Sequence, residues 1–222
     1  MAVGSSCRVN TTGGTRLLVA NASGGRTSVV DPRADATTAS GLWSPDGQHV
    51  LYTRVLLGTR ERQLARIRPG SAASVEVLAA YPLETPARVR LPVAWSPTRE
   101  WVLMGGGLSG ERGLFLAAPD FKSERPLTRR VFEAMGFSKD GRAVLAILRN
   151  SSGTGPPWQL WSVDVATGRE TRLADLDLPA ATDDVRGFSL HPDGTRFATS
   201  IAIWPFDIWM LEGFEGLSQP KR

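Results

Sequence analysis

The segment Leu42-Trp43-Ser44-Pro45-Asp46-Gly47-Gln48-His49-Val50-Leu51-Tyr52 decides the fold, because its pattern returns three more times along the chain. The other copies occupy residues 94–104, 136–146 and 189–198. Steps of 52, 42 and 53 residues separate the positions that open the motif, which are Trp43, Trp95, Phe137 and Leu190. A sequence that repeats at this period folds as a series of similar supersecondary units.

Each copy of the motif predicts a tight hairpin between two strands. Proline presets φ for the first central position of the turn, aspartate accepts hydrogen bonds from the nearby backbone, and glycine accepts the positive φ that follows. We therefore interpret Asp46, Asp140 and Asp193 as turn-forming residues and not as catalytic acids. The second copy supports this interpretation, because Thr98 and Arg99 replace the aspartate and the glycine there while the flanking pattern remains.

The segments between the motifs predict further strands with a gradient of polarity. Residues 143–148 are continuously apolar, which indicates a strand covered on both faces. Trp161, Val163 and Val165 alternate with polar residues, as expected of a half-buried strand. Residues 170–173 mix charged with apolar side chains, which suits an exposed sheet edge. The sequence therefore predicts an all-β fold, a β-propeller of about five four-stranded antiparallel blades.

We expect one propeller domain over residues 1–222. Its parts are a partial blade at 5–31, blades at about 38–80, 92–130 and 133–176, a partial blade at 185–212, and a tail at 213–222. These parts supply fewer strands than five complete blades need. Two arrangements stay open, an incomplete five-bladed ring and the C-terminal part of a larger propeller.

The repeats resemble those of TolB-like β-propellers, which are bacterial relatives of WD-repeat proteins. The matching pieces are residues 43–47, 137–141, 160–164 and 191–194. The resemblance implies that a protein or ligand docks near the propeller axis. Similar propellers occur alone, in envelope proteins, beside prolyl-oligopeptidase-type hydrolase domains and behind bacterial Ser/Thr kinase domains. Residues 208–214 resemble the closing strand of the kinase-linked propellers.

Composition excludes several classes of function. The apolar runs are shorter than the roughly 18 residues that a membrane span needs. No secretory signal is visible, so the default location is cytoplasmic, and a longer parent chain would allow an extracytoplasmic one. One cysteine and two histidines do not make a structural zinc site, and we expect no metal and no cofactor. The net charge is +4, but the arginines are scattered, so we interpret pairs such as Arg88/Arg90 and Arg129/Arg130 as exposed strand edges and expect no nucleic-acid partner.

The main functional hypothesis is a non-enzymatic scaffold that docks a protein or ligand, as the interaction or sensor part of a larger bacterial protein. Recognition should lie on loops at one face, opposite the motif turns. These loops are 31–40, 56–62, 81–92, 105–112, 149–157, 177–186 and 203–206. Position and chemical type select the candidate binding residues Arg60, Arg88, Arg112, Trp158, Asp183, Asp184 and Trp204. Trp158 and Trp204 are selected because we expect them in connections rather than in strands.

Two alternatives remain from the sequence. One is a propeller-type lyase or hydrolase, in which acids and arginines from several blades would converge on an axial site. The other is a propeller fragment that completes itself by self-association through open blade edges.

The Gly105–Gly110 stretch formally matches a dinucleotide fingerprint, but a strand follows it, so we interpret it as a hairpin loop.

Overall fold

The fold is described by a computed structural model. The described residues are 5–11, 14–20, 23–25, 27–31, 33–69, 75–83, 90–106, 112–152 and 154–204. They form seventeen strands in five antiparallel sheets, and the strand order within each sheet follows the chain.

Each sheet is a short meander of consecutive strands. The first sheet contains β1 (Ser5–Thr11), β2 (Gly14–Ala20) and β3 (Ser28–Val29). The second contains β4 (Ala36–Trp43), β5 (Val50–Leu56), β6 (Glu61–Ile67) and β7 (Glu76–Pro82). The third contains β8 (Arg90–Trp95), β9 (Val102–Gly106), β10 (Gly113–Ala117) and β11 (Glu124–Thr128). The fourth contains β12 (Ala134–Phe137), β13 (Ala143–Arg149), β14 (Trp158–Asp164) and β15 (Glu170–Asp175). The fifth contains β16 (Asp184–Leu190) and β17 (Phe197–Ala202).

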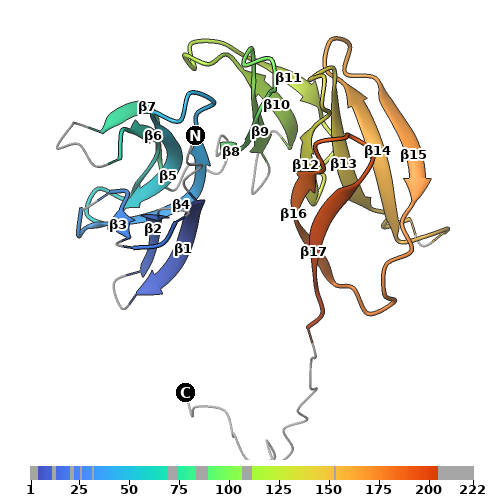
Figure 1. Cartoon of the computed structure of the whole chain (residues 1–222), viewed down its shortest axis with the longest axis horizontal. Coiled ribbons are helices and arrows are strands. Elements are labelled where there is room, and N and C mark those ends of the chain that lie inside the picture. Colours follow the sequence, from blue (N-terminus) through green and yellow to red (C-terminus); the bar gives the residue numbers. More distant parts are fainter. Residues whose placement is uncertain are drawn as a thin grey trace, which may run out of the picture.

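The sheets succeed one another along an arc, with their first strands on the inner side (Figure 1). β4 contacts β8, β8 contacts β12, and β12 contacts β16. This radial arrangement of four-stranded sheets is that of a partial β-propeller, so the predicted fold class is confirmed. The strand expected near residues 207–211, at the end of the fifth sheet, lies outside the described residues.

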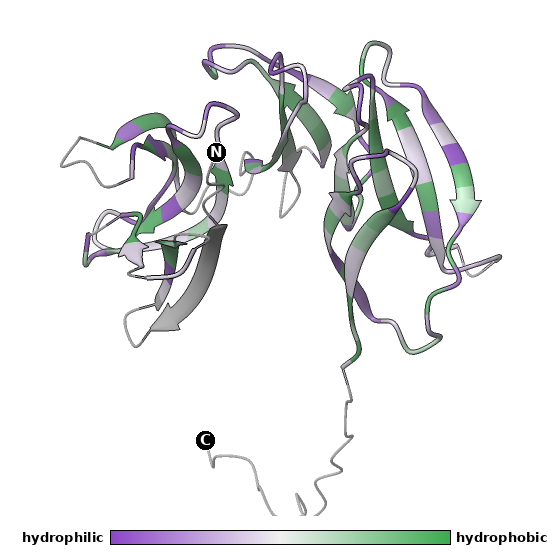
Figure 2. Cartoon of the chain, viewed as in Figure 1, coloured by the Kyte–Doolittle hydropathy of each residue, from purple (hydrophilic) through white to green (hydrophobic). Residues whose placement is uncertain are grey.

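Apolar side chains fill the spaces between neighbouring sheets. β13 illustrates how one strand serves two of these layers. Val144 and Ala146 belong to the core shared with the third sheet, and Ile147 belongs to the core shared with the fifth. The expectation that this strand is covered on both faces is therefore confirmed. β15, the outer strand of the same sheet, is exposed along most of its length and contains both hydrophilic and hydrophobic residues (Figure 2).

A buried polar network, which we call the Asp31 network, joins the connection after the first sheet to the second sheet. The carboxylate Oδ2 of Asp31 accepts hydrogen bonds from Arg54 Nη1 at 2.7 Å and from Tyr52 Oη at 3.0 Å. Arg54 Nε donates to Gln63 Oε1 at 2.8 Å. The side chain of Asp31 is fully buried and that of Arg54 is 5% exposed. Burial, together with the Asp31 carboxylate, raises the pKa of Tyr52 above its ordinary value.

The motif turns have the local structure that their sequence predicts. Asp46 Oδ1 accepts hydrogen bonds from Ser44 Oγ at 2.5 Å and from the backbone N–H of Gln48 at 2.9 Å. The residue after the aspartate has positive φ in all three copies that contain glycine there, 68° at Gly47, 73° at Gly141 and 82° at Gly194. In the second copy Arg99 occupies the same position with φ 64°. The turn conformation is thus kept even where its usual residues are replaced.

These turns make a specific contribution to acid stability. Hydrogen bonds from Ser44, Ser138 and the backbone N–H of Thr195 lower the pKa values of Asp46, Asp140 and Asp193 respectively, the last to about 2. Because the unfolded value is about 3.9, the stabilisation is present above that pH and is lost as the pH falls toward about 2.

We expect the triple variant Asp46→Asn, Asp140→Asn, Asp193→Asn to be less stable than the parent chain at pH 5. The difference should shrink as the pH falls from about 5 toward about 2, because the unfolded parent chain then takes up protons on these carboxylates at a higher pH than the folded chain does. Urea unfolding at a series of pH values measures the difference. A gap that does not change with pH would contradict the assignment of these carboxylates as charged acceptors.

The connections between sheets lie at the opposite end from the motif turns. We call this end the loop face; it carries residues 33–35, 57–60, 83, 112, 129–133, 150–152, 154–157, 176–183 and 203–204. Backbone hydrogen bonds hold its segments together: Leu57 N donates to Asp35 O at 2.8 Å, and Leu83 N to Arg60 O at 2.7 Å. Leu176 N donates to Trp158 O at 2.9 Å in the fourth sheet.

Candidate functional site: an arginine-lined pocket on the third sheet

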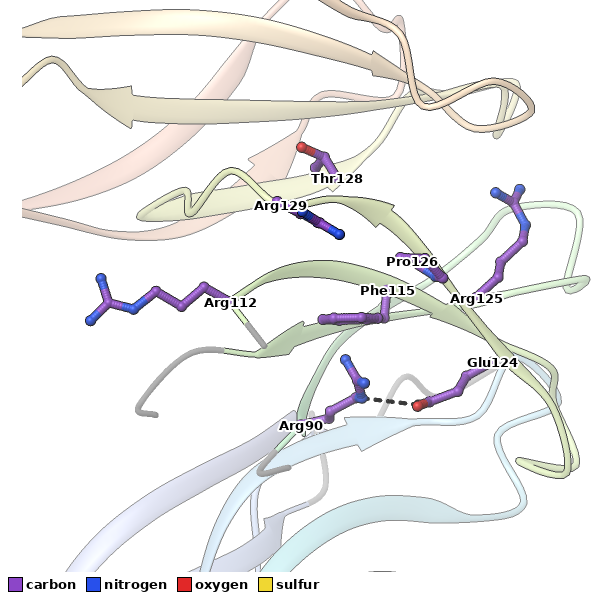
Figure 3. Close-up of a pocket in the computed structure, with 8 residues that line it drawn as sticks. All are labelled: Arg90, Arg112, Phe115, Glu124, Arg125, Pro126, Thr128 and Arg129. Carbon is purple, nitrogen blue, oxygen red and sulfur yellow. Dashed lines mark ion pairs between the residues drawn. The ribbon is translucent and has the colours of Figure 1, made fainter. Parts of the chain in front are cut away.

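A pocket of about 510 Å³ lies on the third sheet and reaches the loop face. The residues that line it are Arg90, Arg112, Phe115, Glu124, Arg125, Pro126, Thr128 and Arg129 (Figure 3). Four arginines and one glutamate give this lining a formal charge of +3. A volume of this size is within the usual range of ligand pockets.

Strand register places the floor residues on one face of the sheet. Phe115 of β10 is opposite Pro126 of β11, and Ala117 is opposite Glu124. Residues two apart along a strand share a face, so Phe115, Pro126 and Glu124 project to the same side. Phe115 and Ala117 pack in the core that also contains Leu64 of the second sheet. The pocket floor therefore lies on the face of the third sheet that packs against the second sheet.

Arg90 crosses this floor from the inner strand to the outer one. Its Nε donates to Glu124 Oε2 at 3.0 Å, and its Cζ lies 3.2 Å from the centre of the Phe115 ring (Figure 3). The Arg90 side chain is only 9% exposed. A stacked guanidinium beside a carboxylate is a favourable way to hold a partly buried positive charge.

The mouth of the pocket carries two further arginines with different surroundings. Arg112 and Arg129 are exposed. Neither makes a side-chain hydrogen bond or an ion pair with any other residue that the structure describes. Arg125 instead directs its guanidinium away from the pocket, where it donates to the carbonyl of Val165 and lies 5.1 Å from the Trp101 ring.

A second, smaller cavity of about 130 Å³ adjoins the pocket. Arg90 and Glu124 line both, while Leu64 and Tyr81 bring the second sheet into the wall of the smaller one. The Arg90–Glu124 ion pair thus lines both the arginine-rich pocket and the smaller cavity, which the second sheet helps to enclose.

The candidate residues from the sequence fall in separate places. Arg112 lies at the pocket mouth. Asp183, Asp184 and Trp204 come together at the loop-face end of the fifth sheet. Asp183 Oδ2 accepts a hydrogen bond from Trp204 N at 2.7 Å, and Asp184 Oδ2 accepts one from Arg186 Nε at 2.5 Å. The Arg186 guanidinium lies 5.5 Å from the Trp204 ring.

The remaining candidate binding residues are Arg60, Trp158 and Arg88. Neither Arg60 nor Trp158 is among the described residues that line the pocket. Arg60 is exposed in the turn between β5 and β6 with φ 52°, and its carbonyl accepts the hydrogen bond from Leu83. The expected position of Trp158 in a connection is wrong, because it is the first residue of β14 and is 2% exposed. It packs with Ile147 and Val185 in the core between the fourth and fifth sheets. Arg88 lies outside the described residues.

Sequence reasoning misses most of the pocket. Arg90 and Arg129 are each half of an arginine pair that the sequence suggests to be an exposed strand edge. The available signal is that arginines stand at strand ends of the same blade: Arg90 begins β8, Arg112 precedes β10, and Arg129 follows β11. Phe115 and Glu124 carry no separate signal, since each has an ordinary strand position.

No group of three histidine, cysteine, aspartate or glutamate side chains suited to a metal ion occurs within the described ranges. In the same part of the chain, no helix has the length and apolar character to cross a lipid bilayer.

Radial four-stranded sheets, inter-sheet cores and a loop face define this chain as a β-propeller protein with a TolB-like fold. No family model matches the sequence, and no curated protein matches it either. TolB from Acinetobacter baumannii superposes with a TM-score of 0.64 at 18% identity, covering 88% of this chain and 46% of that one. A putative TolB from Agrobacterium tumefaciens gives a TM-score of 0.61 at 18% identity, covering 89% and 66%.

Enzymes share the fold as well. Oligogalacturonate lyase from Vibrio parahaemolyticus has a TM-score of 0.58 at 10% identity, with 82% of this chain and 52% of that chain covered. At these identities the likeness establishes the fold alone. The chain spans between about half and two thirds of the length of these three structures.

Proposed function

We propose that this chain is a docking module that binds a protein or ligand partner at its loop face. The observation that carries the proposal is the arginine-lined pocket, whose lining includes two exposed arginines of that face, Arg112 and Arg129. The resemblance of the repeats to TolB-like propellers points the same way. A rigid sheet scaffold with recognition groups on its connections is a common plan for binding proteins.

The proposal is tested by comparing the two ends of the sheets. A loop-face variant combines Arg60→Ala, Arg112→Ala and Trp204→Ala, which are all exposed side chains. A control variant combines Lys139→Ala and Arg142→Ala in the third copy of the motif turn. Both variants should fold, because none of these side chains belongs to a core.

We expect partners cross-linked to the parent chain in cell extract to be lost from the loop-face variant and kept by the control, as quantified by mass spectrometry. Equal capture by the parent and both variants would overturn the proposal. Assays with oligogalacturonate and with dipeptide substrates test the enzyme alternative in parallel, because a docking module turns over neither.

A further inference from the structure

Resting on the docking function proposed above, we infer that the pocket on the third sheet binds an acidic peptide segment of the partner through its carboxylates. Arg112 and Arg129 contact carboxylate groups at the mouth, and the exposed Pro126 ring contacts an apolar side chain between them. This site lies on one sheet and is distinct from a docking site at the propeller axis.

Charge is the first argument. The lining has a formal charge of +3, and its single acid, Glu124, is already paired with Arg90. The planar guanidinium of arginine matches a carboxylate with two parallel hydrogen bonds, which gives both energy and orientation. An approaching anion therefore meets arginine donors at the mouth before it meets any repulsive group.

The contrast between adjacent arginines is the second argument. Arg130 Nε donates to Glu170 Oε2 at 2.6 Å, and its guanidinium lies 4.5 Å from the Trp161 ring. Arg130 thus ties the third sheet to the fourth. Arg129, the preceding residue, has no such partner within the described part of the chain and belongs to the pocket. A structural role therefore explains Arg130 and leaves Arg129 for an external anion.

The floor favours a carboxylate-bearing peptide over a phosphate or a nucleic acid. Glu124 lies within the pocket and repels a dianion brought close to Arg90 more strongly than a single negative charge. Pro126, which is exposed, supplies apolar surface that a peptide side chain covers and an isolated phosphate does not. The site thus fits acidic residues that flank an apolar one.

The test uses the full chain and a fluorescein-labelled peptide of sequence Asp-Glu-Phe-Glu-Asp, with Asn-Gln-Phe-Gln-Asn as its neutral counterpart. The pocket variant is Arg112→Ala with Arg129→Ala. The charge-matched control is Arg142→Ala with Arg169→Ala, which removes two exposed arginines at the motif-turn end. Thermal unfolding confirms that each variant is folded, as expected for exposed sites.

Fluorescence anisotropy should show that the parent chain binds the acidic peptide and not the neutral one. The pocket variant should bind about tenfold more weakly, as expected for two lost charge-assisted contacts, and the control within about twofold of the parent. Binding should weaken as salt increases.

Three outcomes would overturn this inference: equal binding of the neutral peptide, equal loss in both variants, or stronger competition by inorganic phosphate or an oligonucleotide than by acetate. Any of them leaves the docking function standing if the loop-face variant still loses its cross-linked partner. Failure of that cross-linking experiment instead removes the docking function itself.

Discussion

Asp31→Asn lowers the free energy of unfolding by about 3–5 kcal/mol, the usual result of removing one member of a buried ion pair. The substitution keeps the shape of the side chain but removes its charge. Arg54, whose side chain is 5% exposed, then stays buried without the carboxylate that now accepts its hydrogen bond at 2.7 Å. Tyr52 also loses the charged acceptor of its hydroxyl group. The midpoint and slope of urea unfolding give the measurement.

A double-mutant cycle separates the ion pair from general damage. Arg54→Met alone should also destabilise the chain, because Asp31 is then left buried and unpaired. The double variant Asp31→Asn, Arg54→Met should be more stable than the sum of the two single losses predicts, since no unpaired charge remains. A loss below about 1 kcal/mol for Asp31→Asn would contradict the buried network, because it is the size of one ordinary neutral hydrogen bond.

Trp158→Ala should also lower the free energy of unfolding strongly, and it should not change peptide binding. The Trp158 ring is fully enclosed between the fourth and fifth sheets, where Ala134, Ile147 and Val185 surround it. Truncating a buried tryptophan removes apolar contact and leaves a cavity, at a cost of about 3–5 kcal/mol. We expect this loss in urea unfolding, with unchanged peptide affinity per folded molecule.

Trp204→Ala is the matched control for this prediction. Trp204 is 48% exposed at the loop face, so its removal should change stability by no more than about 0.5 kcal/mol. A Trp158→Ala chain that unfolds at the same urea concentration as Trp204→Ala would show that Trp158 is not a core residue.

Much of the fold could be predicted because its determinants are local. The turn after Trp43 depends on a few neighbouring residues, and the same turn recurs at steps of 52, 42 and 53 residues. The apolar run at 143–148 likewise predicts a buried strand from neighbouring residues alone. Even Arg99, which breaks the turn pattern, could be placed, because the residues on either side of it still match.

The pocket could not be predicted because it depends on contacts between distant residues. Arg90 meets Glu124 only when β8 pairs with β9, β9 with β10, and β10 with β11, the last pair with a register shift between Leu114 and Phe115. The position of Trp158 is hard to predict for a related reason. The two prolines before it suggest a loop, but Asn150 N donates to Pro157 O at 2.7 Å, and the hairpin pairing extends to Trp158 and Arg149.

The Asp31 network has a consequence for how the sheets find their neighbours. Sheets built on one plan present similar apolar faces, so hydrophobic contact alone discriminates weakly among wrong orders of assembly. A sheet that docked against β5 without the carboxylate of Asp31 would trap the Arg54 cation in a low-dielectric space. A wrong order of sheets is therefore less stable than the native order. A single aspartate in a connecting segment helps to determine which sheets become neighbours.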